Sequence, residues 1–177
     1  NGVYQFTKEN VFIEIKKYES PAKKIQMKAE SLLLNIGKSE NTLIDKLRYN
    51  GVLEEIMGET IVYGPLLSGR HRCGFKATLG TSKITVRGSQ YETDGCYESE
   101  TKVCIIEAKS IDVSSFNVRQ LYFPYRCVCD VVGDKKTIIS LFIYKDKNDM
   151  IHIHEYMWKN PQSILDLKET NYYKCCM

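Results

Sequence analysis

The chain has 177 residues, 43% of them hydrophobic and 27% charged, with a net charge of +3. This length and composition predict one globular domain that buries a sizeable core. The net charge is too small to indicate a nucleic-acid partner, so that argument depends on where the charges lie. The sequence contains no membrane-length apolar run, phosphate-binding glycine loop, H-E-x-x-H motif or nucleophile elbow, which argues against the corresponding classes of protein.

The N-terminal part predicts less regular elements. Residues 3–17 alternate apolar and polar positions around a turn and predict a lead-in hairpin, closed by Ser20-Pro21. Residues 25–36 have the apolar spacing of an amphipathic helix stopped by Gly37, but an extended segment fits nearly as well. Residues 1–38 are therefore assigned to a lead-in hairpin and a connecting segment, the remnant of an upstream region if the chain is a piece of a longer one.

Helices and strands alternate in the rest of the chain. Thr42 and Asp45 predict the N-cap and third position of a helix that Gly51 breaks. A second helix, opened by serines and ended or kinked by Pro124, is predicted near residues 115–124. The predicted strands are 73–78, 82–87, 90–97, 103–108, 137–146 and 150–158. This order predicts a mixed three-layer α/β domain.

An acidic cluster stands in residues 90–109, QYETDGCYESETKVCIIEAK. Residues two apart on a strand point to the same face, so we expect Glu92 and Asp94 to share a face of one strand. Glu107 and Lys109 should likewise share a face of the next strand. The intervening residues are enough for a turn that returns the second strand beside the first, where the three carboxylates converge.

Converging carboxylates repel one another, and at least one takes up a proton unless a cation lies between them. Hard oxygen ligands of this kind suit Mg²⁺, with Mn²⁺ as a substitute, and both ions also take oxygens from a substrate phosphate. Lys109 is expected either to offset charge that builds on phosphorus or to lose its proton and help deprotonate the attacking water. The residues thus predict a metal site that hydrolyses phosphodiesters.

The alternative is an ordinary antiparallel hairpin that carries Glu and Lys on a solvated outer face as a cross-strand pair. An isolated E-x-K favours that alternative, because antiparallel sheets commonly have one polar face. Here residues 103–106 form an unbroken apolar run into Glu107, and Ala108 continues it, which predicts a strand buried on both faces. A carboxylate that ends a buried strand requires a partner.

Basic residues gather in two groups, at positions 16–28 and 70–87, and the second group directly precedes the acidic strand. That group is placed to hold a phosphate backbone near the metal, as are two arginines of the following helix. For any one of these residues alone, a solvated surface side chain is the more common outcome. The predicted DNA-binding residues are Arg70, Arg72, Lys76, Arg87, Arg119 and Arg126.

Cysteines and histidines give no second metal site. The seven cysteines have no paired spacing of the zinc type. Without a secretory signal they predict a reducing cytoplasmic location, where they serve as small buried hydrophobes or free thiols. His152 and His154 alternate on a strand, and a half-exposed strand face explains them better than a metal pair.

Three segments follow one another in order: YETDGCYE on an acid-bearing strand, IIEAK on the E-x-K strand, and NVRQLYFPYR on a helix. In this order they resemble the PD-(D/E)XK nuclease superfamily, and more narrowly the type II restriction endonucleases of restriction-modification systems. NGVLEEIMGE at 50–59 and Gly69-Arg70 resemble what precedes the catalytic hairpin in such enzymes, so the resemblance covers residues 40–160. Thr93 replaces the proline that names the motif.

The resemblance implies a restriction-endonuclease-like three-layer α/β/α core at residues 39–177, with a mixed central sheet and extra β-hairpins. It implies a metal-dependent endodeoxyribonuclease that cuts duplex DNA by in-line attack of water and leaves a 5′-phosphate. Gln120 would orient the lysine or the water. The implied catalytic residues are Asp94, Glu107, Lys109 and Gln120, and the implied metal ligands are Asp94 and Glu107, with Glu92 and Glu55 as further ones.

Other functions remain open from the sequence. A repair or recombination exonuclease would use the same residues, whereas a non-catalytic DNA-binding module on the same scaffold usually loses an acid or the lysine. A purely structural domain would carry E-x-K incidentally. The chain begins at Asn1, close to a strand, which predicts either an upstream domain of a longer chain or a processed chain. A homodimer is left open, and no membrane partner is expected.

Overall fold

The structure, a computed structural model, describes residues 8–16, 21–29, 31–34 and 36–176. These residues form a mixed α/β protein, as predicted, with a six-stranded sheet of order β2-β10-β9-β8-β6-β5. The strands of this sheet are β2 (Lys23–Gln26), β5 (Gly95–Glu98), β6 (Lys102–Lys109), β8 (Thr137–Lys145), β9 (Ile151–Trp158) and β10 (Leu167–Cys176).

The sheet is mixed because some of its pairings are parallel. β6 runs parallel to β8, and β2 runs parallel to β10, whereas the remaining neighbours are antiparallel. A parallel pair needs a crossover connection, and α3 (Arg119–Val132) lies in the one between β6 and β8. β6 is therefore paired on both edges, with β5 on one side and β8 on the other.

The strand β6 is buried on both faces, as its apolar run predicted. Every residue from Val103 to Ala108 is buried. Val103 and Ile105 pack into one cluster of core side chains, while Cys104, Ile106 and Ala108 pack into another on the opposite face. Polar groups at the end of such a strand must find their partners inside the protein.

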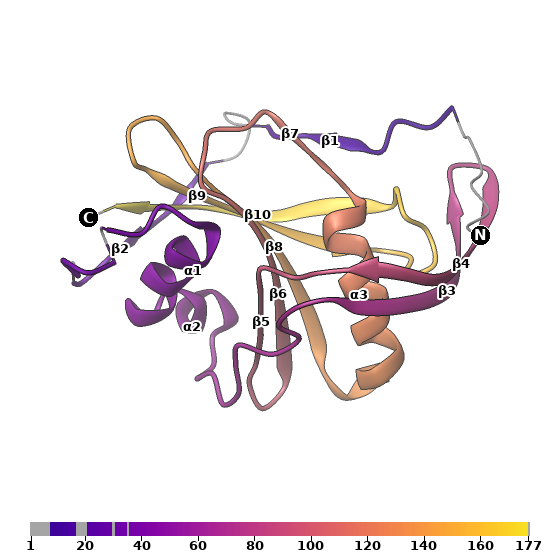
Figure 1. The fold of residues 1–177 in the computed structure, drawn as a ribbon, viewed down its shortest axis with the longest axis horizontal. Helices are drawn as coiled ribbons and strands as arrows, with labels where there is room; N and C mark the ends of the chain where they lie inside the picture. The colour runs from indigo at the N-terminus through magenta and orange to yellow at the C-terminus, as the bar shows by residue number, and fades with distance from the viewer. Residues whose placement is uncertain (1–7, 17–20, 30, 35, 177) are drawn as a thin grey trace.

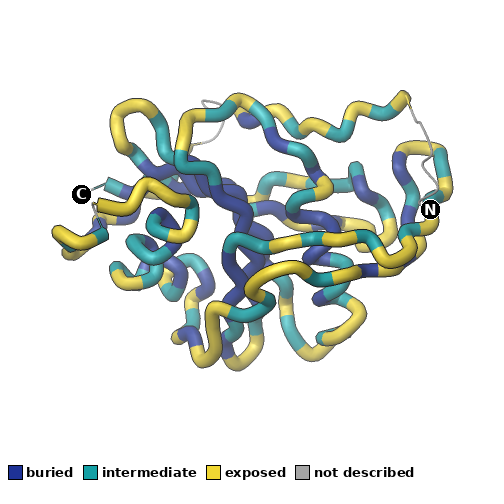
Figure 2. The backbone as a smooth tube through the Cα atoms, in the orientation of Figure 1, coloured by how far each residue is buried: buried dark blue, intermediate teal, exposed yellow. Residues whose placement is uncertain are grey.

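Helices cover the two faces of the sheet. α1 (Glu40–Tyr49) and α2 (Val52–Met57) lie on one side of the central strands, and α3 lies on the other (Figure 1). Leu47 and Leu53 belong to the buried cluster on the first side, and Leu121 and Tyr122 to the cluster on the second. The backbone of the strands between these helices is the most buried part of the molecule (Figure 2). The layers are therefore helix, sheet, helix.

α1 begins earlier than the predicted cap. Ser39 is the N-cap, and its hydroxyl oxygen accepts a hydrogen bond from the N–H of Thr42 at 3.2 Å. Thr42, predicted as the cap, lies inside the first turn. Either residue type caps well, but the helix that starts at Ser39 also places the acid Glu40 at the positive end of the helix dipole. Gly51, with φ of 73°, separates α1 from α2 as predicted.

The second predicted helix is displaced along the chain. Residues 115–117 form a strand, β7 (Ser115–Asn117), and α3 starts only at Arg119. Pro124 neither ends the helix nor sits at its edge. It cannot donate a hydrogen bond to the carbonyl of Gln120, but buried apolar residues before and after it hold the helix against the sheet. The 3-10 turn η1 (Gly133–Lys135) then leads into β8.

A separate antiparallel ribbon, β3 (His71–Leu79) and β4 (Ser82–Tyr91), runs across α3 (Figure 1). It confirms the predicted strands at 73–78 and 82–87. The predicted strand at 90–97 is wrong as a single unit, because β4 ends at Tyr91 and β5 begins at Gly95. Glu92 and Asp94 therefore lie in a connection and do not share a strand face.

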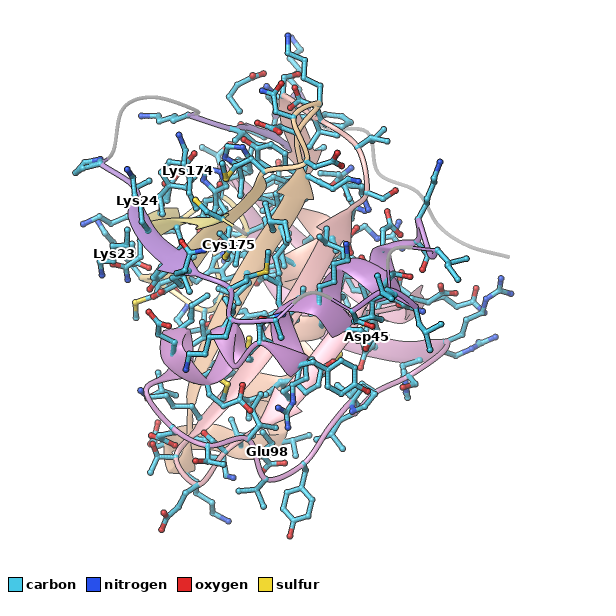
Figure 3. The ribbon with its side chains drawn as sticks, turned by 90° about the vertical axis from the view of Figure 1, so that its left-hand side faces the viewer. Lys23, Lys24, Asp45, Glu98, Lys174 and Cys175 are labelled. Carbon is cyan, nitrogen blue, oxygen red and sulfur yellow. The ribbon has the colours of Figure 1, made fainter. Side chains whose placement is uncertain are left out.

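The N-terminal residues pair with distant parts of the chain. β1 (Phe12–Glu14) pairs with β7, and not with a neighbouring strand of the predicted hairpin. The other arm of that hairpin lies largely outside the described residues. Residues 23–26 are extended, which is the alternative to the helix, and form β2. This strand pairs with β10, a strand that the sequence analysis did not predict. Figure 3 shows Lys23 and Lys24 of β2 next to Lys174 and Cys175 of β10.

The histidines of β9 are buried, which corrects the prediction of a half-exposed face. His152 is 7% exposed and His154 0%. Both stack on tyrosine rings, and Phe116 of β7 stacks on Phe142 in the same face of the sheet. β7 thus helps to cover a face that looked half polar in the sequence. The seven cysteines are all free thiols. Within the described residues, no helix has the length and apolar character to cross a bilayer.

The packing of α1 gives a stability prediction. Leu47 is fully buried, whereas Leu33 in the connecting segment is 78% exposed. Leu47→Ala should lower the free energy of unfolding by about 2 to 5 kcal/mol because it leaves a cavity, and Leu33→Ala by less than about 0.5 kcal/mol. Urea unfolding followed by circular dichroism measures both. Equal losses from the two variants would contradict this placement of α1.

Candidate functional site

The candidate site lies where β5 begins and β6 ends. Asp94 directly precedes β5, and its N–H donates a hydrogen bond to the carbonyl of Ile106 at 3.2 Å. The carboxylate oxygen Oδ2 of Asp94 accepts a hydrogen bond from the N–H of Ala108 at 2.8 Å. These bonds reach the residues on either side of Glu107, so the pairing of the two strands holds the two acids near each other.

Glu107 is the buried acid of the site, only 5% exposed. Its Oε1 accepts hydrogen bonds from Nζ of Lys109, at 2.5 Å, and from the side-chain amide of Gln120 on α3. Burial and, after it, the charge of Asp94 raise the pKa of Glu107 to about 7, against the opposing effect of Lys109. A cation next to both acids would favour their ionised forms.

Lys109 is held as an ammonium group. Burial acts to lower its pKa, but the hydrogen bond and charge of Glu107 outweigh burial and raise the pKa above its usual value. Nζ also donates to the carbonyl oxygen of Ala108 at 3.0 Å and lies 3.4 Å from Oε1 of Glu40. The charged form of Lys109 is therefore stabilised by two carboxylates on different elements.

A pocket of about 440 Å³ opens onto the two acids. It is formed by the end of β4 and the connection to β5, by β6, and by the residues at the start of α3. Its lining residues are Gln90, Tyr91, Glu92, Asp94, Glu107, Asn117, Arg119 and Gln120. A ligand that enters this pocket would meet carboxylates, side-chain amides and a guanidinium group.

Of the further predicted ligands, Glu92 and Glu55, neither contacts this acid pair. Glu92 borders the pocket, but its carboxylate is 60% exposed and forms an ion pair with Arg70 at 2.8 Å. Glu55 is exposed on α2 and lines a different pocket, beside Tyr173 of β10. Its side chain points toward β2 and β10, because Leu53 and neighbouring apolar residues form the buried side of α2. Glu55 is therefore not part of this site, which corrects its prediction as a remote ligand.

Glu40, which sequence reasoning missed, is the helical acid that reaches the site. It lies in the first turn of α1, and its charge contributes to the raised pKa values of both Glu107 and Lys109. The only local signal was an acid directly after a serine that can cap a helix. That signal marks a helix start, but it does not show which strand the helix will meet.

The predicted DNA-binding residues differ in where they lie relative to the pocket. Arg119 lines it, and its Nη2 donates to the carbonyl oxygen of Gln90 at 3.0 Å. Arg126 is different, because its side chain is 12% exposed and forms an ion pair with Asp130 at 3.1 Å, so it does not present a surface cation. The remaining predicted residues are exposed on β3 and β4 or just before them: Arg70, Arg72, Lys76 and Arg87.

The acid pair fits a hard divalent ion. In the part of the chain that the structure describes, no group of three or more His, Cys, Asp or Glu side chains is placed to hold a metal. Mg²⁺ commonly takes one or two carboxylates from a protein and completes its shell with water and substrate phosphate oxygens. Asp94 and Glu107 match that number and kind of ligand, and their mutual repulsion is what a bound cation would relieve.

The fold and site define a mixed α/β protein that carries a carboxylate pair and a lysine at the end of two paired strands. The chain belongs to the family described as Domain of unknown function (DUF6997), whose model matches residues 7–174. No curated protein and no solved structure matches the chain. The family description names no activity, so a function can be inferred only from the site itself.

The raised pKa of Glu107 gives a pH prediction for the metal-free protein. In the folded state this pKa is about 7, against an ordinary value of 4.5 in the unfolded chain. Between these values the folded protein retains a proton that the unfolded chain releases. The stability that protonated Glu107 contributes is therefore complete below pH 4.5 and lost as pH rises through 7, a change of about 3 kcal/mol.

Urea unfolding in the presence of a chelator, from acid pH to pH 8, measures this change. Glu107→Gln should remove most of it and be more stable than wild type at the alkaline end, because the amide never ionises. Glu92→Gln, at an exposed carboxylate, is the matched control and should keep the wild-type dependence. A Glu107→Gln curve parallel to wild type would show that this acid ionises freely in the folded protein.

Proposed function

We propose that this protein is a metal-dependent endodeoxyribonuclease of the PD-(D/E)XK type, similar to type II restriction endonucleases, that hydrolyses phosphodiester bonds of duplex DNA. The observation that carries the proposal is the buried Glu107, in contact with Lys109 and Gln120 and close to Asp94, at the wall of an open polar pocket. Acids whose pKa is perturbed by burial and by a like charge are concentrated at functional sites.

The order of the elements around the site supports the proposal. Asp94 leads into β5, Glu107 and Lys109 end β6, and Gln120 lies on α3, which is followed by β8 parallel to β6. Helices lie on both sides of the sheet. This order agrees with the sequence resemblance, except that Asp94 lies just before β5 and not on a strand, and Thr93 in the place of the proline removes no ligand.

In this proposal Asp94 and Glu107 hold Mg²⁺ or Mn²⁺. The bound ion supplies charge neutralisation at the phosphate and a water molecule of lowered pKa. Asp94 is fixed for this role by the N–H of Ala108, and Glu107 by Gln120, so both carboxylates are positioned before substrate arrives. Such pre-positioning reduces the reorganisation that the reaction would otherwise require.

Lys109 offsets the negative charge on the non-bridging phosphate oxygens during in-line attack of water. Its contacts with Glu107 and Glu40 support this role over that of a base, because both keep the ammonium form. Arg119 is placed at the pocket to contact a neighbouring phosphate of the substrate. As the resemblance to PD-(D/E)XK nucleases implies, water adds to the phosphorus, the bond to the 3′ oxygen breaks, that oxygen takes up a proton, and the product carries a 5′-phosphate.

Metal dependence is the first test of this activity. Supercoiled plasmid should be converted to nicked and linear forms with Mg²⁺ or Mn²⁺, because a covalently closed circle has no ends and responds only to an endonuclease. Ca²⁺ should support binding with little turnover, because its looser shell positions water poorly. Cleavage that survives exhaustive chelation would exclude this mechanism, and degradation confined to linear DNA would point to an exonuclease.

Substitutions separate the site from its surroundings. Asp94→Asn, Glu107→Gln and Lys109→Met should each reduce plasmid cleavage at least about 100-fold, the usual effect of removing a charge that stabilises a transition state. Lys147→Met, at an exposed lysine of the β8–β9 turn, is the control for Lys109 and should leave cleavage unchanged. Full activity in Lys109→Met, with wild-type thermal stability, would reject the proposed role of the lysine.

The two helical acids provide a further matched pair. Glu40→Gln removes one of the carboxylates that hold Lys109, so it should lower kcat by roughly tenfold with little change in KM. Glu55→Gln, whose side chain lines a different pocket beside β2 and β10, should leave both constants unchanged. Initial rates of nicking over a range of plasmid concentrations give these values. A larger effect at Glu55 would restore the assignment that the sequence alone suggested.

A further inference from the structure

The β3–β4 ribbon has an unusual distribution of charge. Residues 70–91 contain five lysines and arginines and no aspartate or glutamate. Four of the five lie on the ribbon itself, and all four side chains are exposed: Arg72, Lys76, Lys83 and Arg87. Within the described residues, none of these four forms an ion pair, whereas Arg70 just before the ribbon is paired with Glu92.

The inner face of the ribbon is fixed to the protein. Phe75 of β3 packs edge-on against the rings of Tyr122 and Phe123 of α3, with ring centroids 5.6 Å and 5.1 Å away. Cys73, Ala77 and Leu79 belong to the same buried cluster. The ribbon is therefore not a freely moving hairpin, since one whole side of β3 is part of the core.

Both edges of the ribbon are also held. Along the edge of β3, the N–H of Thr78 donates to the carbonyl of Gln162 at 2.7 Å, and the N–H of Ile164 donates to the carbonyl of Thr78 at 2.9 Å. Along β4, Arg119 donates to the hydroxyl of Ser89 at 3.2 Å and to the carbonyl of Gln90 at 3.0 Å. The β3 edge and the end of β4 are therefore in contact with the rest of the protein, and the outer face remains available to a partner.

The outer face leads directly to the candidate active site. Gln90 lines the pocket and pairs with Arg72 in the ribbon, and directly paired residues point to the same face. Farther out, Lys76 pairs with Thr85, and Lys83 lies near the tip. A strand of the length of β4 spans about 30 Å, which equals about nine base pairs of duplex. The exposed cations of β3 and β4 thus extend outward from the candidate active site along the ribbon.

We propose that the outer face of the β3–β4 ribbon is a platform for the phosphate backbone of duplex DNA, which it holds beside the active site without reading the bases. This rests on the proposed function and adds the surface that carries the substrate. The major groove admits a two-stranded ribbon, but only one whose sides are free. Here the inner face and the β3 edge are occupied, so the ribbon contacts the backbone from outside.

The composition of the face favours duplex over single-stranded DNA. Proteins that bind single strands combine cations with aromatic side chains on which unpaired bases stack. The exposed positions on the strands of this ribbon carry no aromatic residue: Arg72, Gly74, Lys76, Lys83, Thr85, Arg87, Gly88 and Gln90. A surface of cations and small polar groups suits phosphates and gives no stacking platform for bases.

A charge-neutralised variant tests the platform. Lys76→Gln, Lys83→Gln and Arg87→Gln are combined in one protein, and the matched control combines Lys24→Gln, Lys135→Gln and Lys147→Gln. The control residues are also exposed, and Lys24 lies on the edge strand β2, which is on the opposite side of the molecule from β3 and β4 (Figure 1). Binding to a fluorescent duplex of 24 base pairs is followed by anisotropy with Ca²⁺ in place of Mg²⁺, and circular dichroism verifies folding.

The ribbon variant should bind the duplex at least about tenfold more weakly than wild type at 0.1 M salt, and the slope of log K against log salt should fall by about 2.7 for three lost phosphate contacts. The loss should be equal for two duplexes of unrelated sequence, because backbone contacts carry no sequence information. The control variant has the same change in net charge and should retain most of the affinity and the slope.

An unchanged salt slope in the ribbon variant, an equal loss in the control variant, or a loss confined to one duplex sequence would overturn the platform. So would equally tight, ribbon-dependent binding of a single strand of the same length. Binding and plasmid cleavage are scored separately. Ribbon-dependent binding without any cleavage would support the platform and reject the nuclease activity. Cleavage by a protein whose binding does not depend on the ribbon would support the nuclease activity and reject the platform.

Discussion

The buried carboxylate of Glu107 is the constraint on which the rest of the site depends. It ends a strand whose interior is buried on both faces, and it is itself only 5% exposed. An isolated charge in such a place is strongly unfavourable, so the group must be protonated or partnered. Lys109 and Gln120 donate hydrogen bonds to it for that reason, whereas the nearby charge of Asp94 opposes its ionisation; together these residues connect β6, α3 and the start of β5 at one point.

The register of the sheet keeps these groups together. Gly95 pairs with Ile106 in β5 and β6, and Glu107 pairs with Phe142 in the parallel strand β8. Because side chains alternate along a strand, a slip of one residue would turn Glu107 to the opposite face and replace it by Ile106 or Ala108. Pairing on both edges of β6 prevents that slip, so the position of the acid is set by backbone hydrogen bonds and by apolar packing on each face.

Local patterns in the sequence were sufficient for parts of this arrangement. The run from Val103 to Ala108 predicted a strand buried on both faces, and the E-x-K spacing placed Glu107 and Lys109 on the same side of it. The spacing of Glu92 and Asp94 predicts one strand over 90–97, where the structure has the end of β4, a connection and the start of β5. Nothing local shows that the chain leaves the ribbon at Tyr91 and enters the main sheet only at Gly95.

Contacts between distant segments could not be derived in this way. Glu40 and Glu55 are both helical acids in the same part of the chain, and only the packing of their helices on the sheet decides which one meets Lys109. Leu43, Ile44 and Leu47 bury one side of α1 against the sheet and leave Glu40 at its start, at the end of β6. The apolar residues of α1 thus determine that Glu40 is the acid that pairs with Lys109.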